Sequence, residues 1–438
     1  MSFLSRLALL IGLAFPVAAP AEVAIQPVTS PSGIKAWLVE SHDIPFVSLK
    51  IRFQGGTSLD QPGKRGAVAL MTYTLEEGAG DLDAQGFAMA RDALASSFSF
   101  GADADGIDVT ARFLTENRDA SIDLLRQALV EPRFDQAALD RVRGQILANI
   151  RAKATDPGSL AWDRLAHIAF GDHPYGSSGD GTEDSVSALT RDDVLAAHKD
   201  ALARDRILIG AAGDITPQEL GQMIDRLLGD LPATGAPLPG RADLRLTPGV
   251  TVIDFPGPQS TVTFAQGGIR QTDPDYYAAL ILNTVLGGGN FSSRLMDEVR
   301  EKRGLTYGIG TDFNTYDQAE LLVGQAAVAN QNVGQALDVI RAEWGRIARD
   351  GLTETELADT KTYLTGSYPL QFDGNEDLAA IMVGMQSLGL QPDFPKTRNQ
   401  RVEAVTMDDV KRVAASLFRE QDLRFVIVGQ PDGVKATD

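Results

Sequence analysis

Apolar and polar residues alternate along several short segments of the chain, each closed by glycine or by a polar turn. The alternating segments are 47–56 (VSLKIRFQGG), 106–113 (GIDVTARF) and 260–268 (STVTFAQGG), and two further segments that close on glycine, 205–214 (DRILIGAAGD) and 422–432 (DLRFVIVGQPD), are also expected to be strands. In the second of them, Ile107, Val109 and Ala111 fall on one side, because successive side chains of a strand point to opposite faces. The alternation therefore predicts strands, each with one buried face.

Other segments repeat their apolar residues every three or four positions, which is the spacing of one helix face. Residues 116–129 and 134–154 have this pattern, and residues 65–80 (RGAVALMTYTLEEGAG) form a further helix-like run. Strands clustered with runs of helices favour an α+β fold, in which helices cover one face of a mostly antiparallel sheet.

The same unit occurs twice along the chain. The strands 47–56 and 260–268 both end in Gln-Gly-Gly. Thr190 and Thr406 each precede a pair of aspartates, as a helix N-cap does, and each predicted helix is followed by a strand that closes on glycine. The separations between these landmarks are nearly equal, so the sequence predicts a tandem repeat of two homologous domains with a cleft between them.

The composition between the two repeats places the domain boundaries. Residues 232–249 (PATGAPLPGRADLRLTPG) are rich in proline and glycine and have no periodicity. This stretch is predicted to be an exposed linker between an N-terminal domain, 22–231, and a C-terminal domain, 250–438.

The first 21 residues are predicted to be a cleavable signal peptide. One arginine precedes an apolar run from Leu7 to Phe15, and Ala19-Pro20-Ala21 has the small residues of a cleavage site. The run is too short to span a membrane, so no stable membrane insertion is expected. The chain has no cysteine, which excludes disulfides and thiolate metal sites. Its net charge of −19 disfavours nucleic-acid binding. We therefore expect a periplasmic protein.

Familiar hydrolase motifs are missing. The four histidines are His42, His167, His173 and His198, and no two of them are three or four residues apart. No helix can therefore present a histidine pair to one zinc ion, although a site built from scattered side chains stays open as an alternative. The sequence also lacks a Gly-x-Ser-x-Gly elbow and a phosphate-binding loop.

Three stretches carry a resemblance to a known family: 66–79, PRF at 132–134 and HPYG at 173–176. Together with the repeat, they make nearly the whole mature chain similar to the pitrilysin/insulinase family of zinc peptidases, and in particular to bacterial members with two-domain subunits. The resemblance implies that each subunit forms half of a clamshell that closes around an extended peptide.

The family's metal motif is replaced at every position. In the family, the matching helix carries His-x-x-Glu-His. Here Ala69 and Tyr73 stand for the two histidines and Thr72 for the catalytic glutamate, while Asn149 stands for the third ligand, a glutamate in a later helix. Alanine cannot bind zinc, tyrosine and asparagine are poor ligands, and threonine is no general base near neutral pH. We therefore expect no metal in this chain and none of the family's hydrolysis by the chain alone.

The second half keeps a candidate pair of donors. By resemblance, Arg300 and Tyr307 (REKRGLTYG) face a zinc site across the cleft, contact the substrate backbone and stabilise the oxyanion. Arg303 is the competing arginine, and the spacing to Tyr307 favours Arg300. Gly287, Gly288 and Gly289 follow an apolar helix and read as its C-cap and turn. By resemblance they also form a glycine-rich loop that admits substrate.

These features lead to one expected function and one alternative. The resemblance implies a non-catalytic, zinc-free subunit of a heterodimeric periplasmic zinc metallopeptidase, which would give Arg300 and Tyr307 to a homologous subunit that bears His-x-x-Glu-His and zinc. The alternative is a structural or peptide-binding scaffold, either homodimeric or not, without a catalytic contribution.

Overall fold

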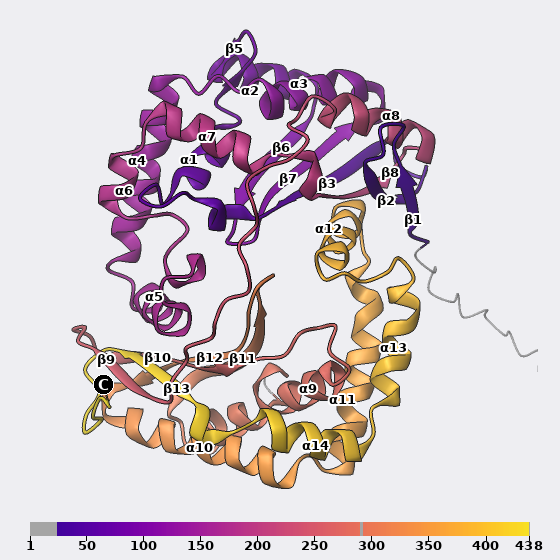
Figure 1. The fold of residues 1–438 in the computed structure, drawn as a ribbon. Helices are drawn as coiled ribbons and strands as arrows, with labels where there is room; N and C mark the ends of the chain where they lie inside the picture. Colours follow the sequence, from indigo (N-terminus) through magenta and orange to yellow (C-terminus); the bar gives the residue numbers. More distant parts are fainter. Residues whose placement is uncertain (1–23, 290–291, 438) are drawn as a thin grey trace, which may run out of the picture.

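Each half of the chain builds one sheet, and the two sheets face each other across the molecule (Figure 1). The structure, a computed structural model, describes residues 24–289 and 292–437. The predicted signal peptide lies outside the described residues. Among the described residues, no helix is both long and apolar enough to cross a bilayer.

The N-terminal sheet has six strands with one parallel pair, β2 and β8. Their order is β1 (Gln26–Thr29), β2 (Lys35–Glu40), β8 (Ile207–Gly213), β3 (Phe46–Gln54), β7 (Gly106–Leu114) and β6 (Ser97–Ala102). The C-terminal sheet has five strands, again with one parallel pair, β13 and β9. Their order is β11 (Thr306–Thr315), β12 (Glu320–Ala329), β10 (Gln259–Gly267), β13 (Arg424–Val428) and β9 (Gly249–Ile253). A small hairpin joins β4 (Gly78–Ala79) and β5 (Leu82–Asp83).

The two sheets repeat one topology. The order β2-β8-β3-β7-β6 in the first is matched by β9-β13-β10-β12-β11 in the second, and the parallel pair occupies the same place in both. All other pairings are antiparallel. The predicted α+β tandem repeat with mostly antiparallel sheets is therefore confirmed.

Helices cover the outer face of each sheet (Figure 1). The first half contains α1 (Ala67–Thr74), α2 (Ala84–Ala93), α3 (Arg118–Val130), α4 (Gln136–Lys153), α5 (Pro157–Phe170), α6 (Glu183–Ser187), α7 (Arg191–Ala201) and α8 (Pro217–Leu228). The second half contains α9 (Tyr276–Asn283), α10 (Val333–Asp350), α11 (Glu354–Ser367), α12 (Asn375–Ser387), α13 (Phe394–Ala404) and α14 (Met407–Leu417).

The predicted N-caps are present in both repeats. The Thr190 and Thr406 hydroxyls accept from the backbone N–H groups of Asp193 and Asp409, at 3.3 and 3.1 Å, and each aspartate accepts from the threonine backbone in return. These reciprocal bonds are capping boxes that fix the starts of α7 and α14.

Two helices cross to the opposite half, which the expectation of helices on one face did not include. Helix α5 of the first half packs on β10 and β13, where Ala161 and Leu165 join Ala265 of the C-terminal sheet. Helix α12 of the second half packs on β2, β3 and β8, and Gln386 Nε2 donates to the Ile209 carbonyl at 2.9 Å. The inner face of each sheet is thus partly covered by a helix of the other half (Figure 1).

The stretch between the halves contains no helix or strand from 232 to 248, and β9 begins at Gly249, the last residue of the predicted linker. It is bonded to both halves. Ala242 N donates to Gln318 O at 2.9 Å and Arg245 N donates to Ala169 O at 2.8 Å, so the stretch is fastened along its length.

Candidate functional site

The first three positions of the degenerate motif lie on α1, which follows β3 after a connection that contains Asp60. Asp60 accepts from the backbone N–H groups of Gly66 and Val68, both at 2.8 Å, and so holds the start of the helix. The helix ends at Thr74, earlier than the matching stretch 66–79 predicted, because Gly78, with a left-handed φ of 117°, turns the chain into β4. Ala69 and Thr72 are buried, and the Tyr73 side chain is partly exposed.

The structure bonds Asn149 to an aspartate that sequence reasoning missed, and the charge of this aspartate also acts on Tyr73. Helix α4 carries Asn149 and packs against α1. Asn149 Nδ2 donates to Asp180 Oδ2 at 3.2 Å, and Lys153 Nζ donates to the same oxygen at 2.6 Å. Burial and the negative charge of Asp180 raise the pKa of the Tyr73 phenol, while Lys153 acts in the opposite direction. Asp180 lies in a loop without a recognisable motif, so its sequence gave no signal.

These side chains do not fit a zinc ion. A stable zinc site needs imidazole, thiolate or carboxylate ligands, and the four motif positions supply a methyl group, a hydroxyl, a phenol and a carboxamide. The Thr72 side chain is fully buried and has no contact with solvent. Over residues 24–289 and 292–437, no three His, Cys, Asp or Glu side chains are grouped to hold a metal.

Arg300 and Tyr307 meet at one pocket in the C-terminal half. Arg300 lies on a π-helical segment, Met296–Glu301, and its Nη1 pairs with Glu301 Oε1 at 2.9 Å. Both side chains line a pocket of about 410 Å³ together with Gln259 and Asn332. The competing Arg303 does not line this pocket. Its Nη1 donates to the backbone carbonyl of Glu298 at 2.7 Å and also forms an ion pair with the Glu298 carboxylate.

A β-bulge explains the exposure of Tyr307. Thr306 pairs with Val328 and Ile309 pairs with Ala326, so β11 has one residue more than β12 over this interval. Tyr307 and Gly308 fall in the bulge, which re-aims side chains and interrupts the ladder. The Tyr307 side chain is 86% exposed, whereas an aromatic residue at the start of a strand is usually half-buried.

Two of the three glycines, Gly287 and Gly288, differ from the predicted C-cap and turn, whereas Gly289 is the C-cap. Helix α9 continues into a π-helical segment, Thr284–Gly288, so Gly287 and Gly288 are helical rather than past the helix end. A Cβ at Gly287 would lie 2.4 Å from Thr311 Oγ1, so glycine is needed where this segment touches β11. Gly289 follows the segment, and residues 290–291 are outside the described part.

A larger pocket of about 790 Å³ adjoins this region, and Tyr307 lines it as well. Gly287 and Gly288 form part of its wall, and the wall also includes Trp162 from α5 and Tyr363 and Arg398 from the second half. The exchange of α5 therefore brings an N-terminal side chain to a C-terminal pocket. None of these three residues carries a motif, and only the three-dimensional packing reveals them.

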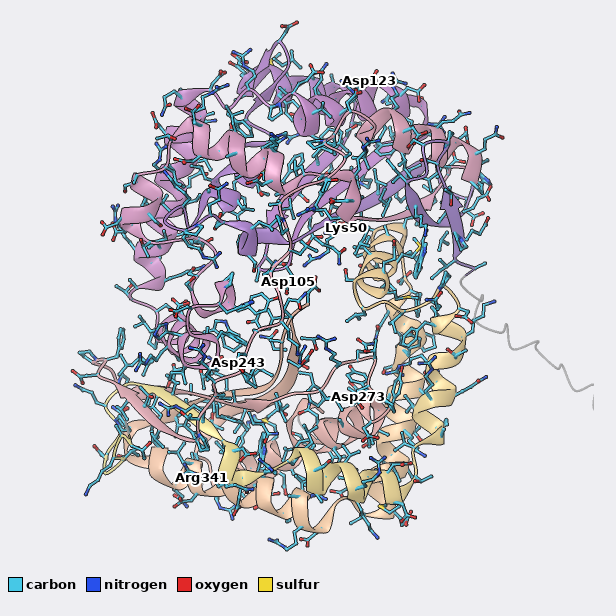
Figure 2. All side chains as sticks on the ribbon, viewed as in Figure 1. Lys50, Asp105, Asp123, Asp243, Asp273 and Arg341 are labelled. Carbon is cyan, nitrogen blue, oxygen red and sulfur yellow. The ribbon has the colours of Figure 1, made fainter. Side chains whose placement is uncertain are left out.

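The two halves also meet at a cluster of aromatic and acidic groups. Asp105, at the turn between β6 and β7, lies where the N-terminal half faces the C-terminal half (Figure 2). The Tyr175 hydroxyl donates to Asp105, and the Asp317 backbone N–H, at the tip of the β11–β12 hairpin, donates to Asp105 Oδ2 at 3.1 Å. The rings of Tyr175 and Tyr316 stack with centroids 4.5 Å apart. This cluster ties the hairpin of one half to the sheet of the other.

Comparison with known proteins gives matches along nearly the whole chain. Residues 188–364 match the family profile described as the Peptidase M16 inactive domain. The non-peptidase homolog YmxG of Helicobacter pylori is 26% identical, over 89% of this chain and 90% of its own length. An uncharacterized zinc protease of Streptomyces coelicolor is 29% identical, over 90% of this chain and 87% of its own length.

Solved structures agree with these matches. The crystal structure of a peptidase M16 inactive domain from Pseudomonas fluorescens superposes with a TM-score of 0.87 at 27% identity, covering 94% of this chain and 98% of the other. A Helicobacter pylori protease structure has the same fold, with a TM-score of 0.82 at 16% identity over 92% of this chain and 99% of its own. The chain is thus similar in sequence and fold to the M16 peptidases, and residues 188–364 match the family's inactive domain.

Proposed function

We propose that this chain is the zinc-free subunit of a heterodimeric periplasmic zinc metallopeptidase and that it completes the active site of a homologous, zinc-bearing partner. In this role Arg300 and Tyr307 contact the peptide at the partner's metal. The chain does not hydrolyse peptides without that partner.

The observation that carries the proposal is the joint position of Arg300 and Tyr307. A guanidinium and an 86% exposed phenol border the same pocket, and both are hydrogen-bond donors. Donors held in place before reaction stabilise a carbonyl oxygen as it gains charge. Arg300 also pairs with Glu301, but a chain whose own metal motif is degenerate generates no oxyanion, which is why a partner's active site is the proposed target of these donors.

The need for a partner follows from the residues of α1 and α4. Neither ligands for zinc nor a general base are found at the four motif positions, so the activated water would come from the other subunit. The pocket of about 790 Å³ beside Tyr307 is large enough for several side chains of an extended peptide. Export to the periplasm rests on the predicted signal peptide, and cell fractionation tests it.

A mixing experiment tests the function. The chain is co-expressed with a zinc-bearing M16 homologue encoded by the same genome, and peptide hydrolysis is measured for each protein alone and for the pair. We expect hydrolysis by the pair only, and Arg300→Ala should depress it at least tenfold while the pair still co-purifies.

The matched control is Arg303→Ala. Arg303 lies in the turn directly after this segment, is bonded to Glu298 and does not line the pocket, so this change should leave hydrolysis nearly intact. Equal activity of the Arg300→Ala and wild-type pairs would refute the role of Arg300. Peptide binding without hydrolysis in any mixture would favour the scaffold instead, and the pocket beside Tyr307 would then be its binding site.

A further inference from the structure

A lysine and an aspartate lie where the family's third metal ligand is expected. Lys153 follows Asn149 by four residues on α4, so the two side chains project from the same face of the helix. Both donate to one oxygen, Asp180 Oδ2, Lys153 at 2.6 Å and Asn149 at 3.2 Å. One carboxylate oxygen of Asp180 therefore accepts from both Asn149, which stands at the position of the lost ligand, and the Lys153 ammonium group.

Asp180 also borders α1, the other helix of the degenerate motif. A Cβ placed on Gly66, at the start of α1, would lie 2.7 Å from the backbone oxygen of Asp180. The charges of Asp180 and Lys153 have opposite effects on the Tyr73 phenol, whose pKa Asp180 raises and Lys153 lowers. The ion pair thus lies at the end of α4 and beside the start of α1, the two helices that carry the four replaced positions.

The pair is more buried on its acidic side. The Asp180 side chain is 15% exposed and that of Lys153 is 44% exposed. A carboxylate largely removed from water needs a positive partner, and in this chain the nearest one is an ammonium group covalently attached to α4.

We infer that Lys153, held by Asp180, replaces the metal cation as the positive charge between α1 and α4 and keeps a metal from returning to this place. A divalent cation placed beside an ammonium group is repelled by it, and in partly buried surroundings this repulsion is much stronger than in bulk water. The inference concerns the N-terminal half alone and does not depend on the proposed role of Arg300 and Tyr307.

Restoring the ligands tests the inference directly. The changes Ala69→His, Thr72→Glu, Tyr73→His and Asn149→Glu are made together, once with Lys153 and once with Lys153→Met. Zinc affinity is measured by isothermal titration. We expect the Lys153→Met version to bind zinc at least about tenfold more tightly than the version that keeps Lys153.

Lys64→Met in the same restored background is the control. Lys64 forms a similar ion pair in the same half, with Asp193 at 2.9 Å, but it does not contact Asp180. Equal zinc affinity with and without Lys153, or an equal gain from Lys64→Met, would overturn the inference.

A second test uses the otherwise natural chain, because histidine at the buried position of Ala69 can prevent folding. Lys153→Met leaves Asp180 without its cation and should lower the melting temperature. Adding Asp180→Asn should raise it again, whereas Asp180→Asn alone should lower it. Additive effects of the two changes would show that the charges are not coupled and would equally overturn the inference.

Discussion

Replacing Gly210 by alanine tests the exchange of helices that holds the two halves together. Gly210 lies in β8, where α12 of the second half crosses the N-terminal sheet. A Cβ at this position would lie 2.3 Å from the carbonyl oxygen of Ala379 and 3.1 Å from Met382 Cβ. The first of these contacts is with helix backbone, which cannot rotate away as a side chain can, so α12 must shift as a unit.

Overpacking of this kind typically costs about 1–3 kcal/mol of folding free energy. Gly101→Ala is the matched control: Gly101 lies in β6 of the same sheet, and a Cβ there would have no atom within 4 Å. Alanine in a strand is otherwise favoured over glycine by roughly 0.5–1 kcal/mol, so the control should be neutral or slightly stabilising.

Hydrogen exchange followed by mass spectrometry is the appropriate assay, since a chain with two cores need not unfold in one step. In the Gly210→Ala protein, amides of α12 and β8 should exchange faster than in the wild type, while those of α10 should keep their protection. In Gly101→Ala both regions should match the wild type. If α12 exchanges at the wild-type rate in Gly210→Ala, then α12 does not pack on the N-terminal sheet as described.

Three further predictions concern buried polar groups. Burial and the neighbouring Asp105 raise the pKa of Asp317 to about 6, so the folded chain holds this proton more tightly than the unfolded chain does, and stability falls as pH rises from about 4 to about 6. Asp317→Asn should therefore raise the melting temperature at pH 7.5 and change it little at pH 4; an equal shift at both would contradict this. Trp344 Nε1 donates to Gln266 Oε1 at 2.7 Å in the C-terminal core, and Trp344→Phe should cost about 1–3 kcal/mol in urea unfolding, more than Trp37→Phe at a half-buried site; equal costs would count against it. Asp60→Ala removes both bonds to the start of α1 and should cost about 1–2 kcal/mol, with faster exchange in α1 than in α2; unchanged protection of α1 would disprove the cap.

Local patterns made much of the fold predictable. Strand alternation, the Thr190 and Thr406 caps and the repeated Gln-Gly-Gly ends all depend on neighbouring residues, and the structure has them in two matching sheets. The end of α1 was less predictable, because the run 65–80 keeps a helical composition up to the glycine that turns the chain at 78.

The exchange of α5 and α12 was not predictable from periodicity. An amphipathic helix has the same pattern whichever sheet its apolar face contacts, so the sequence cannot say that Ala161 packs in the second half. The contacts around the degenerate motif were likewise not predictable from the sequence. Asp180 and Lys153 are ordinary charged residues in the sequence, and only the packing of α4 against α6 and the loop before it places them together.

The candidate donors, Arg300 and Tyr307, were predictable in their identity but not in their exposure. Their spacing identified Arg300 and Tyr307 through a family resemblance, and the structure places both at one pocket. The bulge that exposes Tyr307 comes from a mismatch between β11 and β12, which a single sequence does not reveal. Likewise, the three glycines resembled a helix end, whereas the contact with Thr311 accounts for Gly287 inside a helical segment.

The most direct test of the account is the turnover number of the purified pair with Tyr307→Phe in this chain, measured with saturating peptide. The substitution removes one hydroxyl from a side chain that is 86% exposed, so folding and assembly should be unaffected. Loss of one oxyanion donor should lower kcat by about a hundredfold with little change in KM. A kcat equal to that of the wild-type pair would contradict the claim that this chain contributes a catalytic group to its partner.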